Sequence, residues 1–202
     1  LLALTMVPTV AGALLGVQMQ FSFMAGSPFI SFMLFMGISF AFFYGIEKNK
    51  NSGLGVALLL GFTFFMGLML SRILQVALGF SNGGSMIALA AGGTGAIFAT
   101  LASIASVSKR DFTNMGKFLT VGLVVVLLAM VANIFLQMPV LHLVISAAVV
   151  LLFSGYILYD ISQIMQGGET NYVTATLAVY LDVYNVFVSL LNLIMAFGGD
   201  RD

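Results

Sequence analysis

Seven apolar runs, each close to the length needed to cross a bilayer, constrain this chain more than any other feature. A transmembrane helix needs about 20 consecutive apolar residues, and the polar breaks between these runs are short. The runs cover residues 2–24, 28–46, 54–79, 85–107, 118–137, 140–163 and 173–197. Because the runs are continuous and do not alternate with a period of two, they predict a helical bundle and not a transmembrane β-barrel.

Composition agrees with an all-α integral membrane protein. Hydrophobic residues make up 61% of the 202 positions and charged residues only 7%, too few to cover a water-soluble domain. Lys plus Arg and Asp plus Glu number seven each, so there is no net basic charge for nucleic acid and we expect no nucleic-acid partner. The breaks cannot hold a soluble domain, so the sequence predicts a single seven-helix transmembrane domain over residues 1–202, embedded in a lipid bilayer.

The basic residues between the runs predict the orientation of the chain. Lys48 and Lys50 follow the second run, and three more basic residues lie within 109–117 after the fourth. None follows the first, third or fifth run. By the positive-inside rule the loops that carry them face the cytoplasm. We therefore expect the N-terminus in the cytoplasm. The C-terminus, with the charged residues 200–202, is expected on the opposite side of the membrane.

The seventh run carries a stripe of polar side chains. Asp182, Asn185, Ser189 and Asn192 follow one another at intervals of three or four residues, which places them on one face of a helix. A polar stripe inside lipid must face protein or water, so we expect the other helices to surround this one. The three neutral residues could line a pore or simply hydrogen-bond to neighbouring helices, and the spacing leaves both interpretations open.

Asp160 and Asp182 are carboxylic acids within the last two runs. A carboxylate at the centre of the membrane costs about 2.5–3.5 kcal/mol to insert, so it needs a partner, water or a proton. The two runs are consecutive antiparallel helices with a short connection, so both carboxyls belong to the cytoplasmic half and could approach within a turn or two. Two carboxylates in a low dielectric cannot both ionise cheaply, so a pair in contact would share one proton and titrate as a unit.

Other patterns favour structure over chemistry. His142 lies near the outer end of the sixth run, where a lone histidine is most often an interfacial residue, and we assign it no role. Gly12 with Gly16, and the glycine cluster in 92–95, indicate close packing between helices. After the break at the paired glycines of "QGGETN", residues 169–171 are expected to cap the last helix.

Several motifs in a fixed order carry a resemblance to a known family. "ILYDISQI" and "YLDVYNVFVSLLNLI", together with "MVANIFLQMPVLHLVISA" and "GGETNYVTATLAVYL", resemble the Bax inhibitor 1 family, also called the transmembrane Bax inhibitor motif-containing family. The similarity runs through about residues 54–197 and is greatest to the bacterial branch that includes the inner-membrane modulator of the FtsH protease. It implies six helices around a central seventh, in a bacterial inner membrane.

The resemblance also implies a function. Family members are described as pH-sensitive calcium leak channels with a di-aspartyl sensor on the sixth and seventh helices, and Asp160 and Asp182 match those positions. A basic residue near the cytoplasmic end of the second helix pairs with the sensor in the closed state, which makes Lys48 and Lys50 the candidates for this latch. We therefore expect a non-enzymatic calcium pathway, with the two carboxyls as pH sensor and weak calcium ligands and with no resident cofactor.

Two other functions stay open. The bacterial branch favours a regulatory partner of an FtsH-type membrane protease, with a cytoplasmic tail before Leu1 as the expected contact. An aspartyl intramembrane protease is a remote alternative, because paired carboxylates on neighbouring helices can activate water. Those enzymes set the second Asp in a Gly-x-Gly-Asp sequence, whereas here Val179-Tyr180-Leu181 precedes Asp182.

Overall fold

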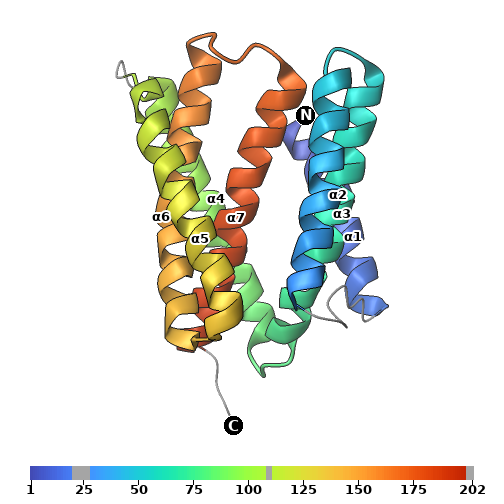
Figure 1. Ribbon diagram of the computed structural model, residues 1–202, viewed down its shortest axis with the longest axis vertical. Helices are drawn as coiled ribbons and strands as arrows, with labels where there is room; N and C mark the ends of the chain where they lie inside the picture. Colours follow the sequence, from blue (N-terminus) through green and yellow to red (C-terminus); the bar gives the residue numbers. More distant parts are fainter. Residues whose placement is uncertain (20–27, 108–110, 199–202) are drawn as a thin grey trace. The chain divides into compact units, whose positions relative to one another are not determined.

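The computed structural model describes residues 1–19, 28–107 and 111–198, and within these ranges the chain is helical, with no strand (Figure 1). The elements are α1 (Leu2–Gln18), α2 (Pro28–Asn49), α3 (Gly53–Leu78), α4 (Gly83–Val107), a short 3-10 helix η1 (Thr113–Met115), α5 (Gly116–Leu136), α6 (Pro139–Met165) and α7 (Tyr172–Gly198). The all-α class and the seven helices predicted from the apolar runs are confirmed.

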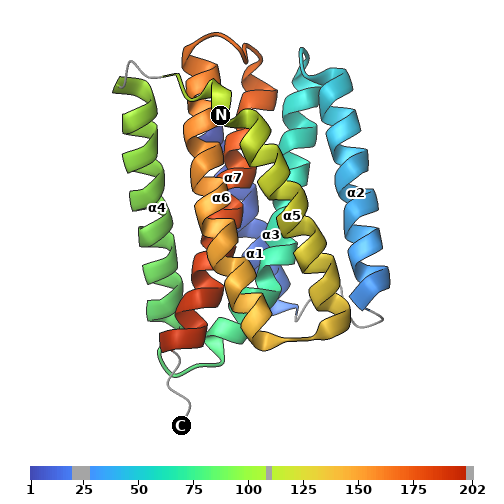
Figure 2. The ribbon, with the colours of Figure 1, turned by 60° about the vertical axis from the view of Figure 1, so that its left-hand side comes forward.

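Six of these helices, α2 to α7, are long and apolar enough to cross a membrane, and they can be followed from a second side in Figure 2. Of the first predicted span, residues 2–24, the structure describes α1, which is shorter than the other six helices. It has 17 residues. This is the lower end of the range of about 17–25 residues for a spanning helix. Residues 20–24 of the expected run lie outside the described ranges.

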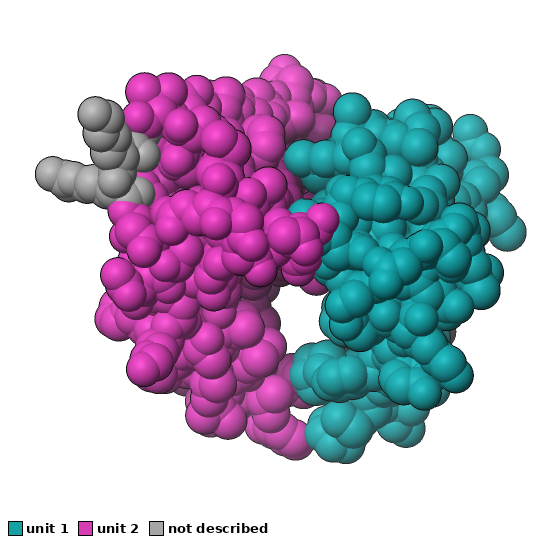
Figure 3. All heavy atoms as spheres, turned by 90° about the horizontal axis from the view of Figure 1, so that it is seen from above, with its two compact units in different colours: residues 1–76, 171–177 teal, residues 77–170, 178–202 magenta. Residues whose placement is uncertain are grey.

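The chain divides into two compact units, which Figure 3 distinguishes by colour. Unit 1 comprises residues 1–76 and 171–177, and unit 2 comprises residues 77–170 and 178–202. Unit 1 therefore holds α1, α2, nearly all of α3 and the first turns of α7. Unit 2 holds α4, α5, α6 and the remainder of α7. The single domain, and the ring of six helices around α7 that the resemblance implies, stay predictions.

In unit 1, α1 packs against α3 at backbone distance. A Cβ atom built on Gly12 would overlap the carbonyl oxygen of Phe64, and one built on Gly67 would overlap that of Thr9. The side-chain amide of Gln75 donates a hydrogen bond of 3.0 Å to the carbonyl oxygen of Gly16. The close packing predicted for the glycine pair of α1 is confirmed, because small residues are what lets two helix backbones approach this far.

The contact between α2 and α3 is aromatic. Phenylalanine rings of the two helices lie with their centroids 5.3–6.2 Å apart, in stacked, tilted and edge-on arrangements. The pairs are Phe35–Phe65, Phe42–Phe62, Phe42–Phe65 and Phe43–Phe62. Such pairs contribute about 0.5–1.5 kcal/mol each beyond the burial of their surface.

In unit 2, α6 packs against both α4 and α5. Gln137, at the end of α5, adopts a left-handed conformation with φ of 51°, and Pro139 begins α6 at a position that suits a residue without an N–H. This tight turn sets α5 and α6 antiparallel, and their buried contact centres on Val126, Ile145 and Val149.

The glycine cluster of α4 is not packed as its sequence predicts. A Cβ atom on Gly92 or Gly95 would meet no other atom within 4 Å, and one on Gly93 would meet only the side chain of Leu190, at 3.5 Å. Gly92 and Gly95 are exposed, so these positions face the exterior of the described helices and not a neighbouring helix. The prediction of close packing is therefore wrong at both.

Candidate functional site

The end of α6 determines where Asp160 lies. Gly167 follows the helix in a left-handed conformation with φ of 75°, which glycine adopts without steric cost. The backbone N–H groups of Gly168 and Glu169 donate to the carbonyl oxygen of Gln163, at 2.9 and 3.3 Å. This end of the helix leaves Asp160 within its last turns, whereas Asp182 lies about three turns into α7.

The structure brings the carboxyl groups of Asp160 and Asp182 together, close enough for a hydrogen bond between them. Asp182 is only 4% exposed, and its Oδ2 has no hydrogen-bond partner among the described residues. An ionised carboxylate can only accept hydrogen bonds, so a bond between two carboxyls requires a proton on one of them. The geometry therefore suits a pair that holds one proton between its two members, and loss of that proton would set two like charges side by side.

Tyr156 completes the surroundings of the pair. It lies one turn before Asp160 on α6, close to both carboxyls and to the side chain of Thr120 on α5. Within the described ranges, no group of three or more His, Cys, Asp or Glu side chains gathers to hold a metal ion. Two carboxyls are too few for a tight calcium site, so the pair can serve calcium only as a weak, partly hydrated ligand.

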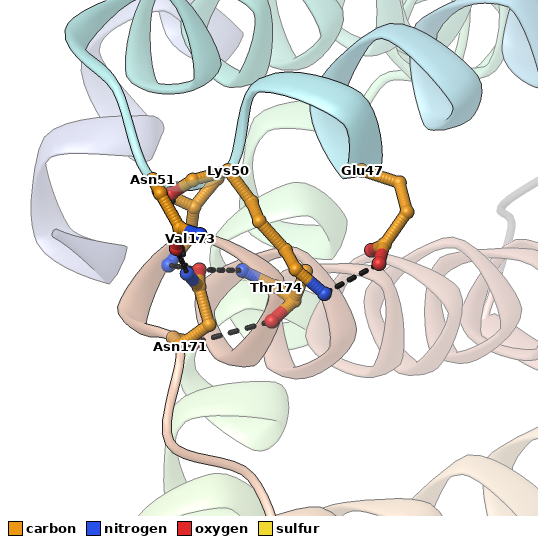
Figure 4. Close-up of polar contacts among 6 residues, drawn as sticks. All are labelled: Glu47, Lys50, Asn51, Asn171, Val173 and Thr174. Carbon is orange, nitrogen blue, oxygen red and sulfur yellow. Dashed lines mark hydrogen bonds and ion pairs between the residues drawn. The ribbon is translucent and has the colours of Figure 1, made fainter.

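The two latch candidates have other contacts in unit 1. Lys50 forms an ion pair with Glu47, which is drawn in Figure 4, and the ammonium group of Lys48 lies 6.0 Å from the centre of the Tyr44 ring. The pairing of either lysine with Asp160 or Asp182 stays a prediction.

Asn171 caps the first turn of α7, as the sequence predicted for this region. Its Oδ1 accepts hydrogen bonds from the backbone N–H groups of Val173 and Thr174, at 2.9 and 3.3 Å (Figure 4). Its amide nitrogen donates to the carbonyl oxygen of Lys50 and to Oδ1 of Asn51, at 3.2 and 2.7 Å. The same side chain therefore caps α7 and joins it to the turn between α2 and α3.

The neutral part of the polar stripe lines a cavity in unit 2. Asn185, Ser189 and Asn192 contribute to a cavity of about 330 Å³ between α5, α6 and α7. Its other polar lining residues are Asn133, His142 and Ser146. Asp160 and Asp182 are not among the residues that line it. The structure thus separates the four members of the stripe into a carboxyl in the pair and three neutral residues in the cavity.

Comparison with known proteins settles the family. The sequence matches the family described as inhibitor of apoptosis-promoting Bax1 over residues 1–199. The chain belongs to the Bax inhibitor family. An uncharacterized protein of Neisseria meningitidis serogroup A is 40% identical over 206 residues, covering 99% of this chain and 89% of the relative. The Escherichia coli K12 protein named modulator of FtsH protease YccA is 44% identical over 147 residues, covering 73% of this chain and 67% of the relative.

The same comparison indicates in which membrane this Bax inhibitor family protein lies. A relative from Escherichia coli O6:H1, also 44% identical, is named inner membrane protein YccA. With six helices able to span a bilayer, the chain is an integral inner-membrane protein. The orientation of its termini stays a prediction, and Lys109, Arg110 and residues 200–202, on which part of it rested, lie outside the described ranges.

Three polar residues at these sites could not be assigned a role from the sequence of this Bax inhibitor family chain. Tyr156 precedes Asp160 by four residues in "YILYD", and that helical spacing was the available signal. The position of His142 near the end of its run predicts an interfacial residue, and the structure places it in the lining of the cavity. Asn133, on α5, had no signal of its own, because one amide in an apolar run does not reveal which neighbour it faces.

Proposed function

We propose that this Bax inhibitor family protein is a regulatory partner of an FtsH-type membrane protease. The observation that supports it is the 44% identity, over 73% of this chain, to the Escherichia coli protein named for that activity. The residue pattern alone favours a calcium pathway, whereas the similarity to this relative favours the regulatory function. A regulator of this kind acts by binding within the same membrane, without enzymatic chemistry of its own.

Reconstitution tests this proposal directly. The full-length protein is incorporated into liposomes with the protease of the same organism, and the degradation of a membrane-protein test substrate is followed over time. We expect degradation to slow as the ratio of this protein to protease rises, and the two proteins to co-purify in detergent. A chain with Asp111→Asn, an exposed carboxyl outside the spans, is the matched control. An unchanged degradation rate together with no co-purification would contradict the proposal.

A calcium pathway is the second candidate, favoured by the buried pair of Asp160 and Asp182. We infer that the pair forms a titratable constriction that calcium passes with retained waters. Oxygen ligands suit a hard cation, and conduction requires weak binding. Protonation of the pair would lower its negative charge and its attraction for calcium. A leak of this kind and regulation of a protease do not exclude one another.

Liposomes loaded with a calcium-sensitive dye test the second candidate. We expect the protein to admit calcium at a rate that depends on pH, and Asp182→Asn to alter or remove that dependence while Asp111→Asn preserves it. A leak equal to that of empty liposomes at every pH would exclude the pathway. A pH-dependent leak that Asp182→Asn leaves unaltered would exclude the pair as its sensor.

We also propose that the N-terminus is cytoplasmic and the C-terminus periplasmic. The basic residues Lys48, Lys50 and Lys117, all in or beside the breaks after the second and fourth runs, support this orientation. Alkaline phosphatase fused to the C-terminus should be active, and a green fluorescent protein fused there after Sec-dependent insertion should stay dark. The reverse pair of results would invert the assignment.

A further inference from the structure

Two neighbouring pockets of unit 2, both open to the surface, share part of their lining. The cavity of about 330 Å³ shares the lining residues Asn133, His142 and Asn192 with a second cavity of about 440 Å³. The second is also lined by Gln137 and Met138 of the turn between α5 and α6, and both residues are exposed. We call the combined space the amide chamber. It begins at the surface of unit 2 beside this turn.

The amide chamber extends well into the membrane-spanning part of its helices. On α6 its lining runs from His142 to Val149, and on α7 from Asn192 to Asn185. Each interval corresponds to about 10 Å along a helix. Asp182 follows roughly 4.5 Å further along α7, so the chamber ends about one turn before the carboxyl pair.

The polar lining groups of the amide chamber come from three different helices. Ser146 donates to the carbonyl oxygen of His142 at 2.9 Å, and the amide nitrogen of Asn185 donates to the carbonyl oxygen of Leu181 at 2.7 Å. Oδ1 of Asn133 accepts a bond of 3.1 Å from the N–H of Met138. Each asparagine amide has two donor hydrogens and an acceptor oxygen, so one bond leaves most of its capacity unused.

Water is the partner that fits this remaining capacity. Unsatisfied polar groups at membrane depth cost several kcal/mol each, and irregular polar surface is tolerated there where it lines a water-filled space. The inner cavity alone has room for roughly ten water molecules at about 30 Å³ each. An acyl chain in the same space would leave the remaining donors and acceptors of the asparagines on α5 and α7 without partners.

The charge of the amide chamber depends on one residue. The lining residues from α5, α6 and α7 and from the connecting turn include no Asp, Glu, Lys or Arg, and His142 is the one titratable side chain among them. His142 is exposed and lies where the two cavities join. An imidazole gains a positive charge on protonation, and in an otherwise neutral entrance this charge repels cations.

We propose that the amide chamber is a water-filled site that hydrated cations and small polar solutes enter beside the turn between α5 and α6. We further propose that protonation of His142 makes the chamber repel cations. The proposal does not depend on calcium conduction or on a protease. It concerns access to a site, so it can be tested in the membrane with no transport assay.

The sequence contains no cysteine, so a thiol reagent reacts with the introduced cysteine and with no other side chain of this sequence. In the full chain in liposomes, Ser189→Cys introduces a single thiol in the chamber, and Val144→Cys introduces one at similar depth on α6, where Val144 is 60% exposed. We expect a water-soluble methanethiosulfonate with a trimethylammonium group to modify the chamber thiol about tenfold faster, because the reactive thiolate does not form in lipid. Asn192→Cys is the second chamber variant if Ser189→Cys does not fold.

The second arm tests His142. The modification rates of the chamber thiol by the cationic reagent and by an anionic sulfonate reagent are compared at pH 8 and pH 5.5, and their ratio cancels the effect of pH on the thiol itself. A unit charge about 4 Å away in water changes each rate about fivefold, in opposite directions, so we expect the cation-to-anion ratio to fall on the order of 25-fold on acidification. In His142→Gln the ratio should stay constant.

Each outcome decides part of the proposal. Equal modification of the chamber and Val144→Cys thiols by both reagents means that the chamber is filled by lipid or closed, and overturns the proposal. If the chamber thiol is modified fast but the ratio of cationic to anionic modification rates is the same at both pH values, His142 is not the source of charge selectivity. That result contradicts the proposed role of His142. Both results are independent of protease regulation and calcium flux, so a failure here can be told apart from a failure of the proposed functions.

Discussion

The two units satisfy their buried polar groups in different ways. In unit 1, four buried hydroxyls donate to carbonyl oxygens of their own helix, three or four residues earlier: Thr5, Thr9, Thr63 and Ser71. In unit 2, two carboxyl groups from different helices, those of Asp160 and Asp182, lie against one another. These four hydroxyls need no proton or water to complete their bonds, whereas a hydrogen bond within the carboxyl pair needs a proton, and we propose that water fills the amide chamber.

This contrast separates a scaffold from the titratable part of the molecule. Helices of unit 1 meet through glycine and phenylalanine, whose contacts do not change with pH. Unit 2 carries the carboxyl pair, and its α6 and α7 present both the pair and the amide chamber. A change of protonation or hydration should therefore act on unit 2 first. The following predictions test the contrast, in order of decreasing expected effect.

The largest effect is expected at the contact between α1 and α3. Gly67→Ala would set a Cβ atom against the backbone of Thr9 and within 3.0 Å of the backbone nitrogen of Ala13, so the helices must separate. We expect a loss of about 1–3 kcal/mol in the free energy of unfolding, the usual cost of overpacking. Unfolding of the purified protein in detergent, followed by circular dichroism, measures it.

Gly37→Ala is the matched control for this substitution. A Cβ atom on Gly37, on α2 of the same unit, would meet nothing within 4 Å. Alanine is the better helix former by up to about 1 kcal/mol, so this variant should be as stable as the original chain or more stable. Equal stability of the two variants would mean that α1 and α3 are not in backbone contact, and the description of unit 1 as a rigid scaffold would fail.

The next effect is expected at the carboxyl pair. Asp160→Ala removes the hydrogen-bond partner of Asp182, whose side chain stays buried, and should cost about 1–2 kcal/mol of unfolding free energy. Asp160→Asn keeps an amide donor in the same place and should cost less. The two variants are compared by chemical denaturation at neutral pH. If they lose the same amount, the hydrogen bond between the two side chains does not contribute to stability.

A loss of about 1 kcal/mol is expected for the cap of α7. Asn171→Ala removes the acceptor for the N–H groups of Val173 and Thr174. Asn171→Asp keeps that acceptor but loses the donors to Lys50 and Asn51, so it separates the cap from the cross-connection. We expect the Asp variant to retain most of the stability, since a negative charge also suits a helix N-terminus. An equal loss in both would assign the stability to the cross-connection.

The helical architecture could be read from the sequence, because apolar runs and turn residues are local signals. The C-terminal end of α6 and the cap at Asn171 could be predicted from the glycines and the asparagine of one short loop. The contact of Asp160 with Asp182 was foreseen as a possibility only, because it depends on the rotation of two helices about their axes.

The polar lining of the amide chamber shows the same limit. The stripe on α7 was evident from its spacing, but its neutral and acidic members serve different sites, and only the neighbouring helices decide which. Asn133 and His142 lie on other helices at the depth where α7 presents Asn192. A periodic pattern identifies a face of one helix, and it does not identify the residues opposite that face.

The smallest effect is expected at Asp111, between α4 and η1 in unit 2. Hydrogen bonds from the hydroxyl and the backbone N–H of Thr113, at 2.5 and 2.8 Å, and from Gln166, at 3.1 Å, hold the pKa of Asp111 below its ordinary value. A carboxyl with a lowered pKa stabilises the folded state at neutral pH, and this contribution is lost as the pH falls below about 4 and through the lowered pKa. Stability should therefore decrease on acidification in part because of Asp111.

Asp111→Asn isolates that contribution. The difference in melting temperature between pH 7 and pH 3.5 should be slightly smaller in the variant than in the original chain, because the amide has no proton to bind. Other carboxyls contribute equally to both chains and cancel in the comparison. An identical difference would mean that the bonds of Asp111 to Thr113 and Gln166 are too exposed to matter. The pH response of unit 2 would then belong to its buried groups alone, which sharpens the contrast with unit 1.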